Sequence, residues 1–253
     1  MVTSRRLRTV PGAPRRTCFV ALVALAALLG TQRSAAATRV TFRTDDGVML
    51  AGTWYEPSSR PAAAVIFVHM LHRSRRDWEG IAQRFASEGI GALAIDLRGH
   101  GESPGGVAAV DGGQADYSSL VLDVRAARRH LSQRGDIQQT RVGIVGASLG
   151  ANLAVLEASG DASVASLALL SPSLDYRGLR NEASLRKFGE RPALLVASDD
   201  DPYALRSVRD LQKAGGGTRE ILVVKQAGHG TSMLARDADL VRTLVDWFRR
   251  TLL

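Results

Sequence analysis

Hydrophobic positions follow two alternating patterns from residue 38 onward. Short apolar runs, typical of buried strands, alternate with segments whose apolar residues recur every three or four positions, as in amphipathic helices. The first two predicted strands flank Asp45-Asp46-Gly47, a turn signal typical of an antiparallel hairpin. We predict strands over 38–44, 48–56, 62–70, 90–97, 141–148, 164–172, 192–198 and 219–226, and helices over 77–89, 116–131, 149–159, 201–215 and 233–253.

This alternation predicts an α/β fold with a mostly parallel sheet of about eight strands and helices on both faces. The chain contains neither an internal repeat nor a linker between domains. Residues 173–191, between two predicted strands, suffice for a short helix or two but not for a large lid domain. We therefore expect one domain spanning residues 38–253.

Residues 1–37 differ in composition from the rest of the chain. They hold six of the 33 basic residues and none of the 25 acidic ones, and an apolar run of 13 residues (18–30) precedes Ala35-Ala36-Ala37. A basic segment, a short apolar run and a small-x-small site are typical of an export signal. As a helix, that run would span only about 20 Å of a hydrocarbon core of roughly 30 Å. We predict a cleaved signal peptide over 1–37 and a secreted or periplasmic protein, with an uncleaved anchor as the alternative.

Charge and cysteine content narrow the function classes. Much of the formal charge of +8 lies in the predicted leader, so we expect neither a nucleic-acid partner nor stable membrane insertion of the mature domain. Cys18 is the only cysteine and belongs to that leader, which leaves no thiol nucleophile or disulfide. The five histidines do not cluster with acidic residues at ligand spacing, so we predict no metal site, and no nucleotide-binding motif indicates a cofactor.

Ser148 lies in GASLG (146–150), where a predicted strand meets a predicted helix. The pattern G-x-S-x-G in this context is typical of a strained turn that presents the serine hydroxyl above the strand ends. The free N–H groups of the helix N-terminus favour an anion beside it. The alternative is a serine that caps the helix, with glycines for close packing.

A carboxylate candidate follows a later predicted strand, in SDDDP (198–202). We choose Asp201 over Asp199 and Asp200 because Pro202 favours an extended Asp201 and begins the next helix. The alternative is that these acids simply cap that helix.

His229 lies between two glycines, in the loop before the last predicted helix. A serine hydroxyl needs a base, and a histidine oriented by a carboxylate supplies one. Ser148, Asp201 and His229 occur in this order, each after its own strand, which favours a nucleophile, an orienting acid and a base over three unrelated roles.

On these residues the chain resembles serine hydrolases of the α/β-hydrolase fold, over almost all of 38–253. The matching features are His69, DLRGHGES (96–103), GASLG, SDDDP and GHG (228–230). DLRGHGES is similar to segments of serine aminopeptidase-like and monoglyceride-lipase-like hydrolases. The lack of a large insertion is similar to the dienelactone hydrolase-like group, which typically has a cysteine where this chain has Ser148.

The resemblance implies an oxyanion hole of two backbone N–H groups. One belongs to Leu149, and the family's HG-x segment, matched to His69-Met70-Leu71, gives Leu71 as the other. Met70 replaces the usual glycine, and we expect its side chain to narrow the acyl pocket or redirect the loop. We expect His69 and His100 to support loops by hydrogen bonding rather than to react.

The basic segment HRSRR (72–76) has two interpretations. We favour a solvated face over a cationic pocket mouth that attracts acidic substrates.

The sequence thus predicts a serine hydrolase that cleaves small carboxylic esters through an acyl-enzyme on Ser148. A small-molecule ester is its expected partner, and an open pocket follows from the absence of a lid domain. Peptidase, thioesterase and lactonase activity remain alternatives because they share the acyl chemistry. A catalytically silent binding module of the same fold is the alternative from another functional class, and a membrane-tethered hydrolase remains open.

Overall fold

The computed structural model describes residues 36–107 and 116–253, so most of the predicted leader lies outside the described residues. The eight strands of the main sheet are β1 (Ala37–Arg43), β2 (Met49–Tyr55), β3 (Ala62–Val68), β4 (Gly91–Ile95), β5 (Ile137–Ala147), β6 (Val164–Leu170), β9 (Ala193–Ser198) and β10 (Arg219–Val224). The helices are η1 (Arg75–Trp78), α1 (Glu79–Ser87), η2 (Ser118–Leu120), α2 (Val121–Ser132), α3 (Leu149–Gly160), α4 (Asn181–Phe188), α5 (Pro202–Leu211), α6 (Ser232–Arg236) and α7 (Ala238–Leu252).

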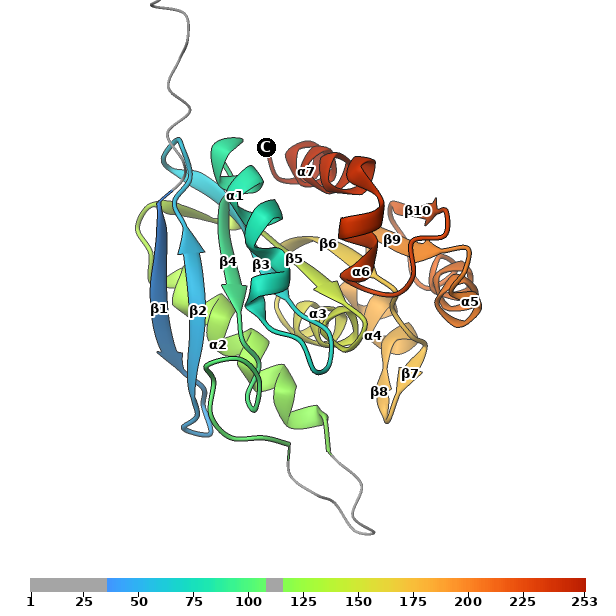
Figure 1. Ribbon diagram of the computed structural model, residues 1–253, viewed down its shortest axis with the longest axis horizontal. Coiled ribbons are helices and arrows are strands. Elements are labelled where there is room, and N and C mark those ends of the chain that lie inside the picture. Colours follow the sequence, from blue (N-terminus) through green and yellow to red (C-terminus); the bar gives the residue numbers. More distant parts are fainter. Residues whose placement is uncertain (1–35, 108–115) are drawn as a thin grey trace, which may run out of the picture. The chain divides into compact units, whose positions relative to one another are not determined.

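The main sheet has the strand order β1-β2-β4-β3-β5-β6-β9-β10 (Figure 1). β2 pairs antiparallel with both β1 and β4, whereas every other neighbouring pair is parallel. All residues of β3, β4 and β9 are buried, as continuous apolar runs require in a sheet covered on both sides. The predicted α/β fold with about eight mostly parallel strands is confirmed.

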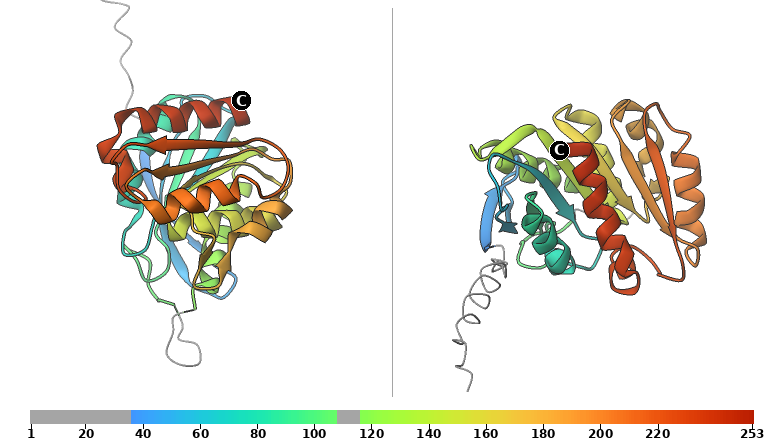
Figure 2. Two further views of the ribbon diagram at one scale, coloured as in Figure 1. Left: turned by 90° about the vertical axis from the view of Figure 1, so that its right-hand side faces the viewer. Right: turned by 90° about the horizontal axis from the view of Figure 1, so that it is seen from above.

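Helices cover both faces of the sheet and enclose two apolar clusters (Figure 2). α1 and α7 pack on one face, and α2, α3 and α5 pack on the other. Parallel strands end at one edge of the sheet, so the loops after β3, β4, β5, β9 and β10 meet there. In open α/β sheets this edge is where ligands bind.

The terminal segment differs from the single long helix predicted over 233–253. It forms α6 and α7, which are separated at Asp237. Asp237 adopts an extended backbone (φ −127°, ψ 102°), and its carboxylate accepts hydrogen bonds from the N–H groups of Asp239 (2.9 Å) and Leu240 (3.0 Å). This cap begins a new helix where the apolar pattern alone continues without a break.

The segment between β6 and β9 is compact and contains one short helix, α4, within the predicted range of a short helix or two. A small hairpin of β7 (Asp175–Tyr176) and β8 (Leu179–Arg180) precedes α4. The side-chain amide of Asn152, on α3, donates to the carbonyl oxygens of Ser173 (3.3 Å) and Leu179 (3.2 Å). These bonds hold the hairpin over α3, and no large lid separates the strand ends from solvent in the described part of the chain.

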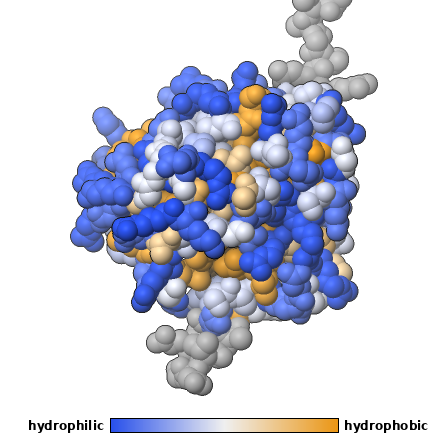
Figure 3. Space-filling view, turned by 180° about the vertical axis from the view of Figure 1, so that it is seen from behind, coloured by the Kyte–Doolittle hydropathy of each residue, from blue (hydrophilic) through white to orange (hydrophobic). Residues whose placement is uncertain are grey.

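The outer surface is mostly polar, as the amphipathic patterns of the helices predict. On the side shown in Figure 3, hydrophilic side chains dominate, and hydrophobic ones gather in a few smaller patches. Within 36–107 and 116–253, no helix combines the length and the apolar character needed to cross a membrane.

Candidate active site

Ser148 occupies the sharp turn between β5 and α3. Its backbone has φ 51° and ψ −115°, a conformation that is strained for a residue with a side chain. A Cβ added to Gly146 would lie 2.2 Å from the carbonyl oxygen of Gly150, and one added to Gly150 would lie 2.3 Å from that of Val68. The flanking glycines therefore allow strand and helix to approach closely enough to form the turn.

Three side chains predicted to act together form a continuous hydrogen-bonded chain. The Ser148 Oγ lies 2.8 Å from the Nε2 of His229, and the Nδ1 of His229 lies 2.6 Å from the Oδ2 of Asp201. A neutral imidazole that donates its Nδ1–H to the carboxylate has a free lone pair on Nε2, which accepts the serine proton. The arrangement is chemically able to activate the hydroxyl.

The three consecutive aspartates have different partners. Asp199 accepts a hydrogen bond from the N–H of Gln226 (2.7 Å), and Asp200 accepts from the N–H of Gly228 (2.9 Å) and from a serine hydroxyl on β9. Asp201 contacts His229 and also caps α5 through the N–H of Ala204 (3.2 Å). The first two carboxylates therefore hold the loop that carries His229, and the third contacts the imidazole itself.

Electrostatics agree with this division of roles. The Ser198 hydroxyl and the Gly228 N–H lower the pKa of Asp200, because both hydrogen bonds favour the charged carboxylate. The Asp201 side chain is 14% exposed, whereas that of His229 is 48% exposed. A shielded acid and an accessible base suit a site that solutes enter from solvent.

His69 braces the loop after β3 from a fully buried position. Its Nε2 accepts the N–H of Leu97 (3.0 Å), and its Nδ1–H donates to the carbonyl oxygen of Met70 (2.8 Å). Burial lowers the pKa of His69 to about 4, so the ring is neutral at pH 7. His100 donates its Nδ1–H to the carbonyl oxygen of Arg98 (3.0 Å), within the loop after β4. Both rings contact backbone rather than Ser148.

The two backbone N–H groups matched to an oxyanion hole lie in the expected segments. Leu149 is the first residue of α3, where the helix itself supplies no acceptor for the N–H. Leu71 lies in the tight turn closed by the bond from the Arg73 N–H to the Met70 carbonyl oxygen (3.2 Å). Both N–H groups are therefore candidates for holding an anion beside Ser148.

The Met70 side chain packs under the loop that carries His229. A Cβ added to Gly230 would lie 2.6 Å from the Met70 Sδ and 3.7 Å from the Cβ of Ala147. Met70 also packs against the apolar cluster on the α7 face of the sheet. Met70 thus takes part in a packing contact between two loops, and its effect on the acyl pocket stays a prediction.

The basic segment 72–76 is not one solvated face, because Arg75 is buried. Its guanidinium pairs with the fully buried Asp96 and with Glu102 (2.6 Å), and its backbone N–H donates to Asp96 (2.7 Å). This cluster ties the loop after β3 to the loop after β4. Its partners lie 21 and 27 residues further along the chain, so local charge pattern offered no signal for it.

Sequence reasoning also missed Asp77 and Thr231, which connect two loops of the site. The Thr231 hydroxyl donates to Asp77 Oδ2 (2.6 Å), and Asp77 accepts two hydrogen bonds from Arg73 Nε and Nη2 (both 2.8 Å). No group of three or more potential metal-binding side chains occurs among the residues that the structure describes.

Comparison with known proteins places the chain in a family. A family model described as serine aminopeptidase, S33, matches residues 59–214, which is more than half of the chain. An uncharacterised protein of Mycobacterium tuberculosis is 34% identical over 120 residues, a match that covers 46% of this chain and 39% of that relative. The chain thus matches well under half the length of this relative.

Two solved structures share the fold. Dienelactone hydrolase from Anabaena variabilis has a TM-score of 0.72 at 18% identity, covering 87% of this chain and 100% of that one. Acetyl xylan esterase from Paenibacillus sp. R4 has a TM-score of 0.73 at 16% identity, covering 87% of this chain and 85% of that one. With the eight-stranded sheet and the strained turn at Ser148, these findings show that the chain belongs to the serine aminopeptidase S33 family, a family of hydrolases with the α/β-hydrolase fold.

Proposed function

We propose that this hydrolase cleaves carboxylic esters through an acyl-enzyme formed on Ser148. The observation that carries the proposal is the unbroken chain from the Ser148 Oγ through His229 to Asp201, with distances of 2.8 and 2.6 Å. Acyl transfer by serine requires this arrangement: the nucleophile is hydrogen-bonded to a base, and the base is hydrogen-bonded to a carboxylate that orients it.

The proposed acylation step uses this geometry. His229 Nε2 takes the hydroxyl proton as the Ser148 Oγ forms a bond to the ester carbonyl carbon. The carbonyl oxygen becomes an oxyanion that accepts hydrogen bonds from the N–H groups of Leu149 and Leu71. When the tetrahedral intermediate collapses, the bond to the leaving alkoxide breaks, and the alkoxide takes the proton from Nε2 and leaves as an alcohol.

Deacylation repeats these steps with water. His229 Nε2 removes a proton from the water as its oxygen attacks the acyl carbon. The second tetrahedral intermediate then releases the Ser148 oxygen, which regains its proton from His229, and the free acid leaves. Asp201 keeps Nδ1 protonated throughout, so that Nε2 faces Ser148 in the form that accepts a proton.

The described loops favour small, soluble esters. The segment between β6 and β9 contains only a short hairpin and α4, and the candidate base is about half exposed. A long acyl chain needs an extended apolar wall to bury it, and each buried methylene contributes about 0.8 kcal/mol. The acetyl xylan esterase of the same fold is named for an acyl group of this small size.

Hydrolysis of p-nitrophenyl acetate, butyrate and decanoate tests the proposal. We expect kcat/KM to be highest for the two short esters, and Ser148→Ala to lower it by about 10³-fold or more. Ser159→Ala is the matched control, because its hydroxyl bonds to a carbonyl near the far end of α3 (2.8 Å) and should leave activity unchanged. Equal activity of Ser148→Ala and wild type, or cleavage confined to aminoacyl anilides, would contradict ester hydrolysis on Ser148.

We also propose that residues 1–37 direct export and are removed. The support is the basic segment, the apolar run and the small residues that end the leader. The intact mass of the protein recovered outside the cytoplasm tests this. A mass that includes residues 1–37 would contradict cleavage.

A further inference from the structure

Two loops that supply the proposed chemistry lie side by side. The first, residues 69–74, follows β3 and contains Leu71, whose N–H is a candidate oxyanion donor. The second, residues 226–231, follows β10 and carries His229. The distance from base to nucleophile depends on how these two loops are held relative to one another and to Ser148.

The loop that carries His229 is built from residues with unusual backbone freedom. Gly228 and Gly230, on either side of His229, have positive φ angles of 79° and 59°. Glycine gives such a loop its shape but leaves it intrinsically mobile. Contacts on both sides of His229 must therefore hold it. On the upstream side they come from Asp199 and Asp200, which bind the N–H groups of Gln226 and Gly228.

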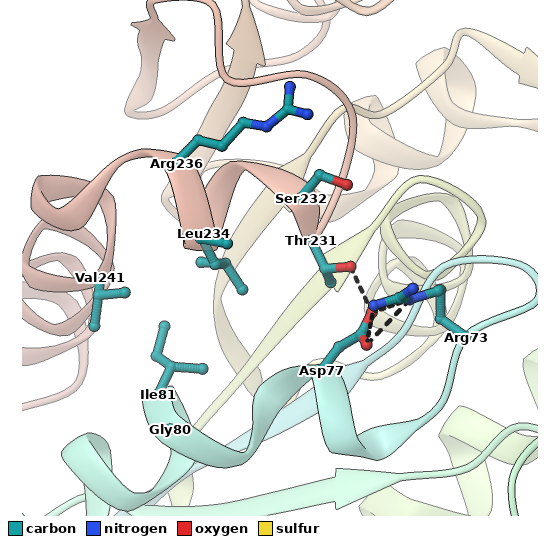
Figure 4. Close-up of a pocket in the computed structure, with 10 residues that line it drawn as sticks. Arg73, Asp77, Gly80, Ile81, Thr231, Ser232, Leu234, Arg236 and Val241 are labelled. Atoms are coloured by element: carbon teal, nitrogen blue, oxygen red, sulfur yellow. Dashed lines mark hydrogen bonds and ion pairs between the residues drawn. The ribbon is translucent and has the colours of Figure 1, made fainter.

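On the downstream side the anchor is Asp77. Its carboxylate accepts a hydrogen bond from the Thr231 hydroxyl (2.6 Å) and two from the Arg73 guanidinium, as the dashed lines in Figure 4 show. Asp77 is 10% exposed at its side chain, and Thr231 is buried. Burial alone would raise the pKa of Asp77, but Arg73 and Thr231 outweigh this effect and lower the pKa, so the carboxylate is charged at neutral pH.

A packing contact reinforces the same connection. The Met70 sulfur occupies the space that a side chain at position 230 would fill. Met70 belongs to the first loop and Gly230 to the second, so this contact joins the two loops. The hydrogen bond from Thr231 to Asp77 ties the second loop to η1, and Asp77 in turn accepts hydrogen bonds from Arg73 of the first loop.

We propose that Asp77 is a positioning residue that holds His229 in reach of Ser148 by binding Thr231. This inference rests on the proposed ester hydrolysis. Asp77 and Thr231 touch neither Ser148 nor the imidazole in the described hydrogen bonds, so they act through the backbone of the second loop. Their loss should lower kcat and leave KM nearly unchanged, because substrate binding is not affected and His229 is the base in both acylation and deacylation, so both steps slow together.

A cavity beside the bond offers a second way to test its role. A hollow of about 540 Å³ is lined by Asp77, Thr231 and Arg73, and its far wall is formed by the apolar side chains of Ile81 and Val241 (Figure 4). Removing the Asp77 carboxylate would leave a cation, a hydroxyl donor and an opening to solvent. A small carboxylate such as formate fits that space and supplies the missing acceptor.

The experiment compares five variants with p-nitrophenyl acetate as substrate. Misplacement of a reacting group by about 1 Å costs up to about 100-fold in rate, so we expect Asp77→Ala and Thr231→Val each to lower kcat about 10-fold, with KM changed less than about 2-fold. Thr231→Ser and Asp77→Asn keep the hydroxyl and an acceptor oxygen, so we expect them to retain most of the wild-type kcat. The double variant Asp77→Ala/Thr231→Val should be no slower than either single variant, because both remove the same bond.

Formate supplies the decisive readout. Sodium formate should raise the kcat of Asp77→Ala several-fold, whereas sodium chloride at the same ionic strength should not. Thr231→Val, which lacks the donor, should not respond to formate. Thr243→Val is the matched control, because the Thr243 hydroxyl bonds only within α7 (2.9 Å); we expect it to have wild-type kcat.

The proposal would be overturned if Thr231→Val had the wild-type kcat. It would also be overturned if Thr231→Ser were as slow as Thr231→Val. Asp77 would be a purely structural residue if Asp77→Ala lost activity and did not respond to formate while Thr231→Val stayed fully active. Inactivity of the wild-type protein toward every ester would instead contradict the proposed function.

Discussion

The assignment of Asp201, rather than either neighbouring aspartate, can be tested by one series of isosteric changes. Asp199→Asn, Asp200→Asn and Asp201→Asn each replace one carboxylate oxygen by an amide nitrogen with little change of shape. Only Asp201 contacts the imidazole of His229, through Oδ2 at 2.6 Å from Nδ1. An asparagine at position 201 presents an N–H to Nδ1 of His229, which favours the tautomer with the proton on Nε2. In that tautomer Nε2 has no free lone pair, so it cannot accept the serine proton.

The expected magnitudes follow from these contacts. The wrong tautomer lowers kcat by about 10⁴-fold in enzymes that use this chemistry, which corresponds to about 5 kcal/mol of transition-state stabilisation. Asp199 and Asp200 bind backbone N–H groups at 2.7 and 2.9 Å. An asparagine oxygen still accepts such bonds, so Asp199→Asn and Asp200→Asn should lower kcat less than about 10-fold.

The assay is steady-state hydrolysis of p-nitrophenyl acetate by all three variants, with thermal melting to confirm that each is folded. A loss of about 10⁴-fold in Asp200→Asn with nearly full activity in Asp201→Asn would refute the assignment. Equal losses in all three variants would refute the separation between loop anchoring and orientation of the base.

Three further predictions concern the loops around the site. Gly230→Ala should lower the free energy of unfolding in urea by about 2 kcal/mol, because the residue has φ 59° and its new Cβ would meet the Met70 sulfur. In the double variant Gly230→Ala/Met70→Ala, only the part of this loss that comes from the clash with Met70 should be recovered. Hydrogen bonds from Arg98 lower the pKa of Asp46 to about 2 from the usual 3.8, so this stabilisation is present above about pH 4 and is lost as the pH falls toward 2. Asp46→Asn should therefore cost about 1 kcal/mol at pH 7, a value limited by solvent screening, and only a small part of that at pH 2, where the carboxylate is about half protonated. Burial depresses the pKa of His69 from 6.5 to about 4. As the pH falls from 6.5 to 4, the free energy of unfolding should therefore decrease more steeply for the wild type than for His69→Gln. Parallel decreases in the two proteins would contradict a buried neutral ring.

The order of strands and helices could be read from the sequence because burial leaves a direct pattern. β3 and β4 are continuous apolar runs with every residue buried, and α1 shows helical spacing on one side. The break at Asp237 escaped prediction because apolar periodicity continues across it. It depends on the hydrogen bonds that the N–H groups of Asp239 and Leu240 donate to the Asp237 carboxylate.

At the candidate site, sequence order was enough to select Ser148, Asp201 and His229, which the structure brings into hydrogen-bond contact. The supporting contacts were not predictable, because each depends on a partner far away in the sequence. Asp77 meets Thr231 across 154 residues, and no local pattern marks either of them.

Modification of Ser148 by a fluorophosphonate tests the central claim most directly. Such a reagent reacts with a serine whose hydroxyl is activated by a base, and ordinary serines of a folded protein do not compete. Intact mass should show one adduct on the wild-type protein and none on Ser148→Ala. Absence of an adduct on the folded wild-type protein, or an equal adduct on Ser148→Ala, would contradict an activated nucleophile at this position.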